Sequence, residues 1–169
     1  MVKEFVEREL LPHRTEWENL GTVPREVWRK AGMAGLLGCD IPESYGGPGG
    51  DFLHNAIVTY EMTAIAGGGP SFAGHSDVVV PYLVELGTEE QKQLWLPRMA
   101  TGEAIGAVAM TEPSAGSDLQ AIRTTARKVD GGYEVTGQKV FITTVFRRTS
   151  SSSPARPTTR RAGRTSLCS

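Results

Sequence analysis

The stretch MTEPSAGSDL, residues 110–119, is the most informative part of this 169-residue sequence. It reads as a turn-rich loop whose small side chains leave the backbone amides and the hydroxyls of Thr111 and Ser117 accessible as donors. Such a loop can lie against a flat, polar-edged ring or a pyrophosphate. It lacks the lysine of a Walker loop and the glycine spacing of a dinucleotide fold. From these residues alone, the favoured interpretation is a plain connection in which Pro113 and Gly116 only set backbone dihedral angles.

The sequence before this loop has a helical pattern, because apolar side chains recur there every three or four residues. A glycine- and proline-rich loop, residues 38–51, separates the helices into an earlier and a later group. The expected helices cover residues 2–19 with a kink or restart at Pro12, a segment from Pro24 that is ended by Gly32 and Gly35, residues 52–66, residues 72–86 with an interruption at Pro81, and a segment from the capping box at 88–91 to Gly102.

The period changes after Gly102. Residues 105–110 are predicted to form a short buried strand, and residues 125–136 a hairpin around Asp130-Gly131-Gly132. One more strand is expected at 139–143. The order of helices first and antiparallel strands later predicts an α+β fold, with a helical bundle-like domain followed by the start of an antiparallel β-domain. The expected boundaries are 1–101 for the helical domain, 102–144 for a partial β-domain and 145–169 for a tail.

Composition excludes several classes of function. The formal net charge is −1, so no global charge points to nucleic acid or an anionic membrane. Cys39 and Cys168 are the two cysteines, and no metal spacing or disulfide framework can be built from them. No apolar run approaches the length of a membrane span, and the N-terminus does not read as a signal peptide. The expected setting is a bacterial cytoplasm.

A second motif, GQKVFIT at residues 137–143, follows the hairpin. Together with MTEPSAGSDLQ it resembles the two separated flavin motifs of the acyl-CoA dehydrogenases, which are FAD-dependent flavoproteins. The segments WRKAGMAGLLGCDIPESYGGPGGD at 28–51 and LGTEEQKQLWLPRMATGE at 86–103 are similar to that family's helical region. The resemblance covers residues 4–143, and EFVERELLPHRTEWE at 4–18 looks most like the long-chain branch.

The resemblance implies an N-terminal helical domain, a middle β-domain and a C-terminal four-helix domain, with FAD between the last two. It implies that Thr111 donates to the pyrimidine edge of the flavin, and that Phe141 packs on the ring where the family more often has tryptophan. Ser117 is expected near both the diphosphate and the acyl-CoA substrate. The residues expected to bind the cofactor are Val108, Ala109, Met110, Thr111, Glu112, Pro113, Ser114, Ala115, Gly116, Ser117, Phe141, Ile142 and Thr143.

The resemblance also implies a function: α,β-dehydrogenation of fatty acyl-CoA in fatty acid β-oxidation, by a homo-oligomer that passes electrons to an electron-transfer flavoprotein. The family takes its catalytic base from the C-terminal domain, and no carboxylate here matches it. We therefore assign no catalytic residue and expect this chain alone to be an inactive fragment that binds FAD weakly or not at all. The alternatives are a truncated, non-enzymatic product and an acyl-CoA oxidase-like flavoenzyme.

The tail, residues 145–169, contains six arginines and no acidic residue, which leaves the preceding part at about −7. We expect it to be disordered, because it offers no apolar face. The run Thr149–Ser153 stands where the family continues Asp-Leu-Val-Ile-Val, and a one-base shift in GC-rich codons converts one into the other. We hypothesise a frameshift near residue 144, with a genuine basic extension as the alternative.

A few other residues have a structural explanation beside the functional one. His75 is expected in a buried helix, either lining the acyl pocket or packed and hydrogen-bonded in the core. Trp28 and Trp95 are expected on the buried faces of their helices. The glycines after Tyr45 are explained most simply by the backbone conformation of a loop.

Overall fold

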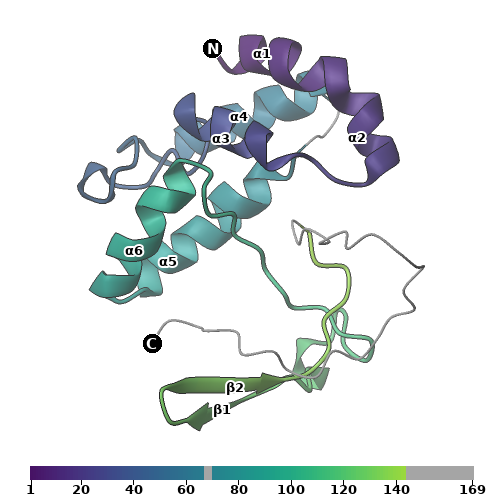
Figure 1. Cartoon of the computed structure of the whole chain (residues 1–169), viewed down its shortest axis with the longest axis vertical. Helices are drawn as coiled ribbons and strands as arrows, with labels where there is room; N and C mark the ends of the chain where they lie inside the picture. The colour runs from purple at the N-terminus through teal and green to yellow at the C-terminus, as the bar shows by residue number, and fades with distance from the viewer. Residues whose placement is uncertain (67–69, 144–169) are drawn as a thin grey trace. The chain divides into compact units, whose positions relative to one another are not determined.

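The computed structural model describes residues 1–66 and 70–143, and it divides the chain into two units (Figure 1). The first unit, Met1–Val108, is helical, and the second begins at Ala109. The tail and the proposed frameshift position lie outside the described residues. Within those residues, no helix is long and apolar enough to cross a membrane.

The N-terminal helical run changes its geometry just before Pro12. It consists of α1 (Val2–Phe5), a π-helical segment (Val6–Leu10), a 3-10 turn (Leu11–His13) and α2 (Arg14–Leu20). The predicted restart at Pro12 is therefore confirmed, since proline has no N–H for the helical ladder. The buried stripe consists of Phe5, Val6, Leu10 and Trp17.

The next helices confirm two predicted elements and correct one boundary. Helix α3 (Arg25–Met33) follows Pro24, and α4 (Phe52–Ala66) follows the glycine-rich loop, which holds a 3-10 turn at Glu43–Tyr45. Gly32 does not end α3 but lies inside it. A Cβ there would stand 2.3 Å from the carbonyl carbon of Thr101, so this glycine permits close contact with the chain just after α6.

The last helices are α5 (Val80–Leu86) and α6 (Glu89–Ala100), and a π-helical segment (Gly74–Val79) precedes α5. The expected interruption at Pro81 is a change from π to α geometry without a break, because proline is tolerated in the first turn of a helix. The capping box is confirmed. The Gln91 N–H donates to Thr88 Oγ1 over 3.3 Å, and the Thr88 N–H donates to Gln91 Oε1 over 3.0 Å.

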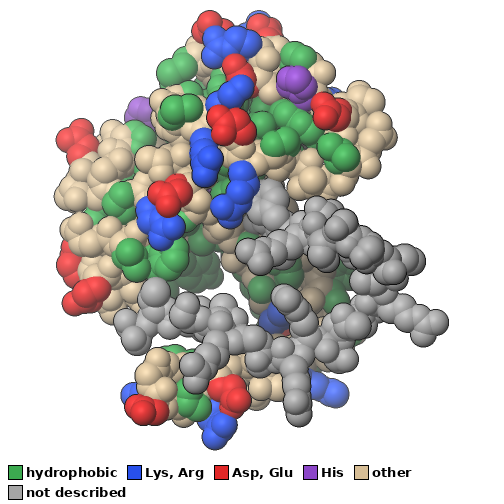
Figure 2. Space-filling view, viewed as in Figure 1, with side chains coloured by type: hydrophobic (Ala, Val, Ile, Leu, Met, Phe, Trp, Pro, Cys, Tyr) green, Lys and Arg blue, Asp and Glu red, His purple; other side chains and the backbone are tan. Residues whose placement is uncertain are grey.

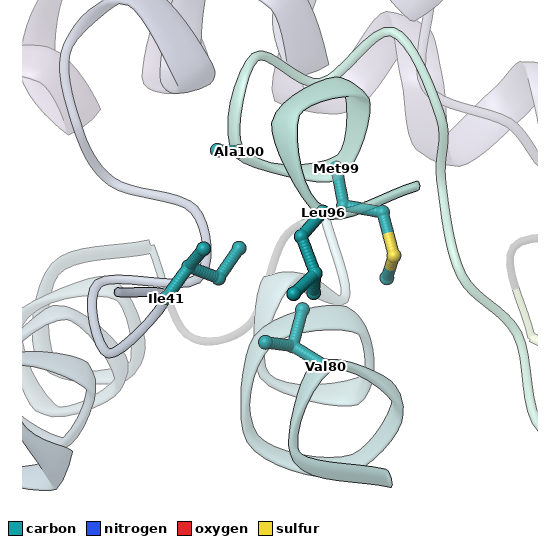
Figure 3. Packing of buried hydrophobic residues seen from close by; sticks show 5 residues of the cluster. All are labelled: Ile41, Val80, Leu96, Met99 and Ala100. Atoms are coloured by element: carbon teal, nitrogen blue, oxygen red, sulfur yellow. The ribbon is translucent and has the colours of Figure 1, made fainter. Parts of the chain in front are cut away.

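One buried cluster joins the loop before α4 to the two last helices. It contains Ile41, Val80, Leu96, Met99 and Ala100. Figure 3 shows the side chains of Leu96 and Val80 pointing toward one another across the contact between α6 and α5. Trp95 packs partly buried against this cluster, and Trp28 is buried as predicted. On the face of the helical unit in Figure 2, acidic and basic side chains are interspersed.

The second unit contains the predicted hairpin. Strands β1 (Thr125–Val129) and β2 (Gly132–Thr136) pair antiparallel, with Thr125 opposite Thr136 and Val129 opposite Gly132. The two-residue connection uses Gly131 at a φ of 75°, a conformation that glycine adopts without strain. A 3-10 turn at Leu119–Ala121 precedes the hairpin.

The two other predicted strands are wrong. Residues 105–110 form no strand, and side chains take two of their backbone groups: the Gly106 N–H donates to His75 Nδ1, and the Met110 carbonyl accepts from Lys139 Nζ. The segment is also half-exposed rather than buried. Residues 139–143 are not a strand either, because Phe141 has a φ of 56° and turns the chain out of the extended conformation.

Candidate functional site

The loop that opens the second unit is closed by its own backbone. The Glu112 N–H donates to the Ala115 carbonyl over 2.9 Å, and the Ala115 N–H donates back to the Glu112 carbonyl over 3.1 Å. This reciprocal pair fixes a tight turn through Pro113 and Ser114. Pro113, Ser114, Gly116 and Ser117 are exposed, and Thr111 is half-buried. The loop therefore presents small hydroxyl and amide donors on a fixed backbone.

The second predicted motif lies directly beside this loop. The Val140 N–H donates to the Thr111 carbonyl oxygen over 3.0 Å. Lys139 Nζ donates to the Met110 carbonyl oxygen, also over 3.0 Å. Residues 110–111 and 139–140 are therefore neighbours in space although a hairpin separates them in the sequence. The two segments that the resemblance assigns to one cofactor are brought together.

Phe141 is the most exposed large apolar side chain of the described residues, at 91%. It is also the one described non-glycine residue with a positive φ. Residues held in sparsely populated backbone conformations cluster at active sites and ligand-binding segments. Ile142, after it, is half-buried, and Thr143 is exposed. An exposed aromatic face beside a donor-lined loop suits stacking on a planar ring.

Glu112 occupies a different environment from the other loop residues. Its side chain is 4% exposed and lies 2.9 Å from Lys139 Nζ. It accepts from the Arg123 N–H over 2.7 Å, from the Thr124 N–H over 3.0 Å and from the Thr124 hydroxyl. These bonds, led by the Thr124 hydroxyl, lower the pKa of Glu112 to about 2. The carboxylate is directed into the unit, and Ala115, at the other end of the same turn, is also buried.

The remaining residues of the expected cofactor set lie around this loop. Val108 is the last residue of the first unit and is half-buried, whereas Ala109 and Met110 are exposed. A Cβ built on Gly116 would meet nothing within 4 Å, so the backbone there is open to close approach. Exposed hydroxyls, an open glycine and an exposed aromatic ring on adjoining segments are a donor set that fits FAD. Among the described residues, no group of acidic, histidine and cysteine side chains could hold a metal ion.

His75 is packed in the core of the helical unit. Its ring is fully buried and lies edge-on to Trp28 at 5.8 Å between ring centroids. The Gly106 N–H donates to Nδ1 over 2.9 Å, so Nε2 carries the proton and donates to the Met99 carbonyl over 3.2 Å. Burial lowers the pKa of His75. Both ring nitrogens have protein partners, which favours the packed interpretation over a place in the acyl pocket.

The structure contains a cavity that sequence reasoning missed. It measures about 240 Å³ and lies between α4 and the segment before the π-helix, lined by Val58, Thr59, Met62, Thr63, Pro70, Ser71, Phe72 and Ala73. Its lining is mostly apolar, with hydroxyls from threonine and serine. The spacing of Val58 and Met62 by one helical turn is the signal that could have indicated a shared wall. Such a signal does not reveal which segment faces it.

A helical unit followed by a unit with an antiparallel hairpin, in which the loop at 110–117 and the segment at 139–143 adjoin, is an α+β arrangement. Residues 1–103 match the model of the acyl-CoA dehydrogenase N-terminal domain, and residues 107–166 match that of the middle domain. The chain belongs to the acyl-CoA dehydrogenase family.

Individual relatives agree with this assignment. The mitochondrial long-chain specific acyl-CoA dehydrogenase of Mus musculus is 50% identical over 142 residues, which are 84% of this chain and 33% of that protein. The crystal structure of an acyl-CoA dehydrogenase from Geobacillus kaustophilus matches with a TM-score of 0.76 and 45% identity, over 83% of this chain and 37% of that one. The Bacillus anthracis enzyme complexed with FAD matches with a TM-score of 0.70 and 34% identity, over 83% and 25%. The chain spans about a third of the length of the curated relatives it matches.

Proposed function

We propose that this chain provides the N-terminal helical domain and one wall of the flavin site of an FAD-dependent acyl-CoA dehydrogenase. The observation that carries the proposal is the hydrogen bond from the Val140 N–H to the Thr111 carbonyl, which joins the two motifs of the expected cofactor site. We keep the proposed boundaries at 1–101 for the helical domain, 102–144 for the partial β-domain and 145–169 for the tail.

Different residues of the chain are proposed to contact different parts of the cofactor. Thr111 donates to the polar edge of the ring, and a fixed donor at that edge stabilises negative charge there. Ser117 and the open backbone at Gly116 approach the diphosphate, and Ser117 also contacts the acyl-CoA. Phe141 would pack on the flavin ring, and Thr143 would donate a hydrogen bond to it. When bound, FAD supplies the hydride acceptor for α,β-dehydrogenation of a fatty acyl-CoA.

The acyl chain is proposed to enter the cavity between α4 and residues 70–73. Its apolar lining of Val58, Met62 and Phe72 suits methylene groups, whose burial provides the binding energy. The similarity to long-chain enzymes supports a long-chain substrate. This assignment is independent of His75, whose ring is committed to the Met99 and Gly106 backbone.

We propose that a group other than Glu112 is the general base that removes the proton from the α-carbon of the acyl-CoA. The Glu112 carboxylate is buried and already accepts several hydrogen bonds, so it has neither the access nor the basicity of a general base. The family resemblance places that base in a C-terminal helical domain. It also supports a homo-oligomer in fatty acid β-oxidation with electron-transfer flavoprotein as the electron acceptor. A bacterial cytoplasm remains the proposed setting.

A flavin titration tests the proposal. The 169-residue chain is expected to bind FAD weakly and saturably, and Phe141 is expected to quench flavin fluorescence by stacking. Phe141→Ala and Thr111→Val should each weaken binding, because one removes the aromatic face and the other a hydroxyl donor. Thr125→Val is the matched control, since Thr125 is exposed on β1 and outside the two motifs. Absence of saturable binding would reject a flavin-binding surface that functions in this chain alone, and unchanged binding by both variants would reject the site.

A further inference from the structure

The Glu112 side chain connects three separate parts of the second unit. It starts in the loop, accepts from the backbone of Arg123 and Thr124 just before β1, and pairs with Lys139 in the segment after β2. With 4% of its side chain exposed, the carboxylate has its oxygens turned to protein donors. The carboxylate is therefore engaged by protein groups rather than presented on the surface of this loop.

Lys139 extends the connection to the loop that is expected to bind flavin. Its Nζ lies 2.9 Å from Glu112 Oε1 and donates over 3.0 Å to the Met110 carbonyl. The next residue, Val140, donates its N–H to the Thr111 carbonyl. The loop and the second segment are thus joined by one side-chain contact, from Lys139, and one backbone contact, from Val140. Glu112 in turn pairs with the Lys139 side chain.

This arrangement sets the direction of the Thr111 backbone N–H. The chain has no described cis peptide, and in a trans peptide the N–H points opposite to the preceding carbonyl. Because the Met110 carbonyl points to Lys139 Nζ, the Thr111 N–H points away from Lys139. Rotation of the Met110–Thr111 peptide would therefore have two effects at once. It would turn the Thr111 N–H to another direction and would break the hydrogen bond between Lys139 Nζ and the Met110 carbonyl.

We propose that Glu112 and Lys139 are positioning residues that fix Thr111 relative to Phe141, and that flavin affinity depends on this pair although neither carboxylate nor ammonium touches the flavin. The affinity part of the proposal rests on the proposed function. Glu112 also neutralises Lys139, so the pair adds little net charge beside the cofactor. Thr124 completes it by donating both its N–H and its hydroxyl to the same carboxylate oxygen.

The test combines hydrogen exchange with FAD binding in the full 169-residue chain. In Glu112→Gln and Lys139→Met, we expect at least tenfold faster exchange of the Val140 amide and several-fold weaker FAD binding. The double variant should lose no more than the worse single variant, because residues that act as one unit are not additive. Lys139→Arg keeps a cation that can reach both oxygens, and it should restore most of the exchange protection and of the affinity.

The matched controls are Glu134→Gln and Lys128→Met, which make the same changes on the exposed hairpin. Unchanged Val140 exchange in both Glu112→Gln and Lys139→Met would overturn the inference. Faster exchange with FAD affinity equal to that of the unsubstituted chain would overturn its functional part. If the unsubstituted chain binds no FAD while the exchange effect is present, the positioning contact stands and the proposed flavin function fails.

Discussion

His75 Nδ1 accepts a hydrogen bond from the Gly106 N–H, 31 positions further along the chain, over 2.9 Å. The same ring donates to the Met99 carbonyl at the end of α6. One fully buried imidazole thus ties the π-helical segment to both α6 and the chain that leaves it. Because the ring uses one nitrogen as donor and the other as acceptor, it is neutral in the folded protein.

Replacement of this ring should destabilise the helical unit. His75→Leu removes both hydrogen bonds of the ring. The Met99 carbonyl keeps the Gly102 N–H as a donor, whereas the Gly106 N–H loses its bond to Nδ1, and loss of a buried hydrogen-bond partner costs roughly 1–3 kcal/mol. We expect the free energy of unfolding to fall by about 1–3 kcal/mol, measured by urea denaturation with circular dichroism. His13→Leu is the control, because His13 is an exposed residue whose ion pair contributes little. Equal losses in both variants would contradict the role given to His75.

The pH dependence of the same variant has a defined sign. Burial lowers the pKa of His75 below its ordinary 6.5, so the unfolded chain takes up the proton more readily than the folded one. The contribution of neutral His75 to the free energy of unfolding is therefore fully present above pH 6.5 and decreases as the pH drops below it. His75→Leu should remove this dependence, and an unchanged slope between pH 7 and 5 would argue against a neutral buried ring.

Two glycines should respond to alanine in opposite ways. Gly32→Ala places a Cβ against the Thr101 backbone and should cost at least about 1–3 kcal/mol of stability. Gly116→Ala enters open space, so stability should hold while FAD binding weakens, because the new methyl group occupies the approach to the backbone. Thermal unfolding and flavin titration of both variants check this, and a stable Gly32→Ala would show that α3 does not pack closely at this point.

Acidification should loosen the second unit through Glu112. Its folded pKa of about 2 lies below the ordinary 4.5, so the stability it provides is full above pH 4.5 and is lost as the pH falls toward 2. The amide signals of Arg123 and Thr124 report on this carboxylate directly. We expect them to shift over that range in the unsubstituted chain and in Glu134→Gln, but not in Glu112→Gln. A midpoint near pH 4.5 would contradict the buried, hydrogen-bonded carboxylate.

Narrowing the cavity should weaken binding of a long-chain acyl-CoA. Thr63 lines the cavity but is itself exposed, so Thr63→Trp can cover the cavity without disturbing the core. Exclusion of about two methylene groups, at about 0.8 kcal/mol each, should weaken binding of palmitoyl-CoA roughly tenfold. Ala64→Trp, the neighbouring exposed position of α4, is the control for calorimetric titration. Equal affinities of Thr63→Trp and Ala64→Trp for palmitoyl-CoA would show that the acyl chain does not bind in this cavity.

Local signals in the sequence predicted the elements that local interactions form. The capping box at Thr88 and Gln91 lies within one turn, and the hairpin turn at Gly131 needs only its own backbone. The strand predicted at 105–110 failed because a strand depends on a distant partner, and His75 and Lys139 take up two of its backbone groups. The pairing of Glu112 with Lys139 and the walls of the cavity are also contacts between distant segments. No spacing in the sequence reveals the Glu112–Lys139 pair, and the spacing of Val58 and Met62 indicates one wall of the cavity but not the segment that faces it.

The central claim is that the loop at 108–117 and the segment at 141–143 form one flavin-binding surface. The most direct measurement is an NMR titration of the ¹⁵N-labelled 169-residue chain with FAD, a method that detects weak binding residue by residue. Saturable shifts should concentrate in these two segments, with Thr111 and Phe141 affected together and with a common dissociation constant. Shifts confined to one segment, shifts elsewhere in the chain, or no saturable shift in either segment would contradict the claim.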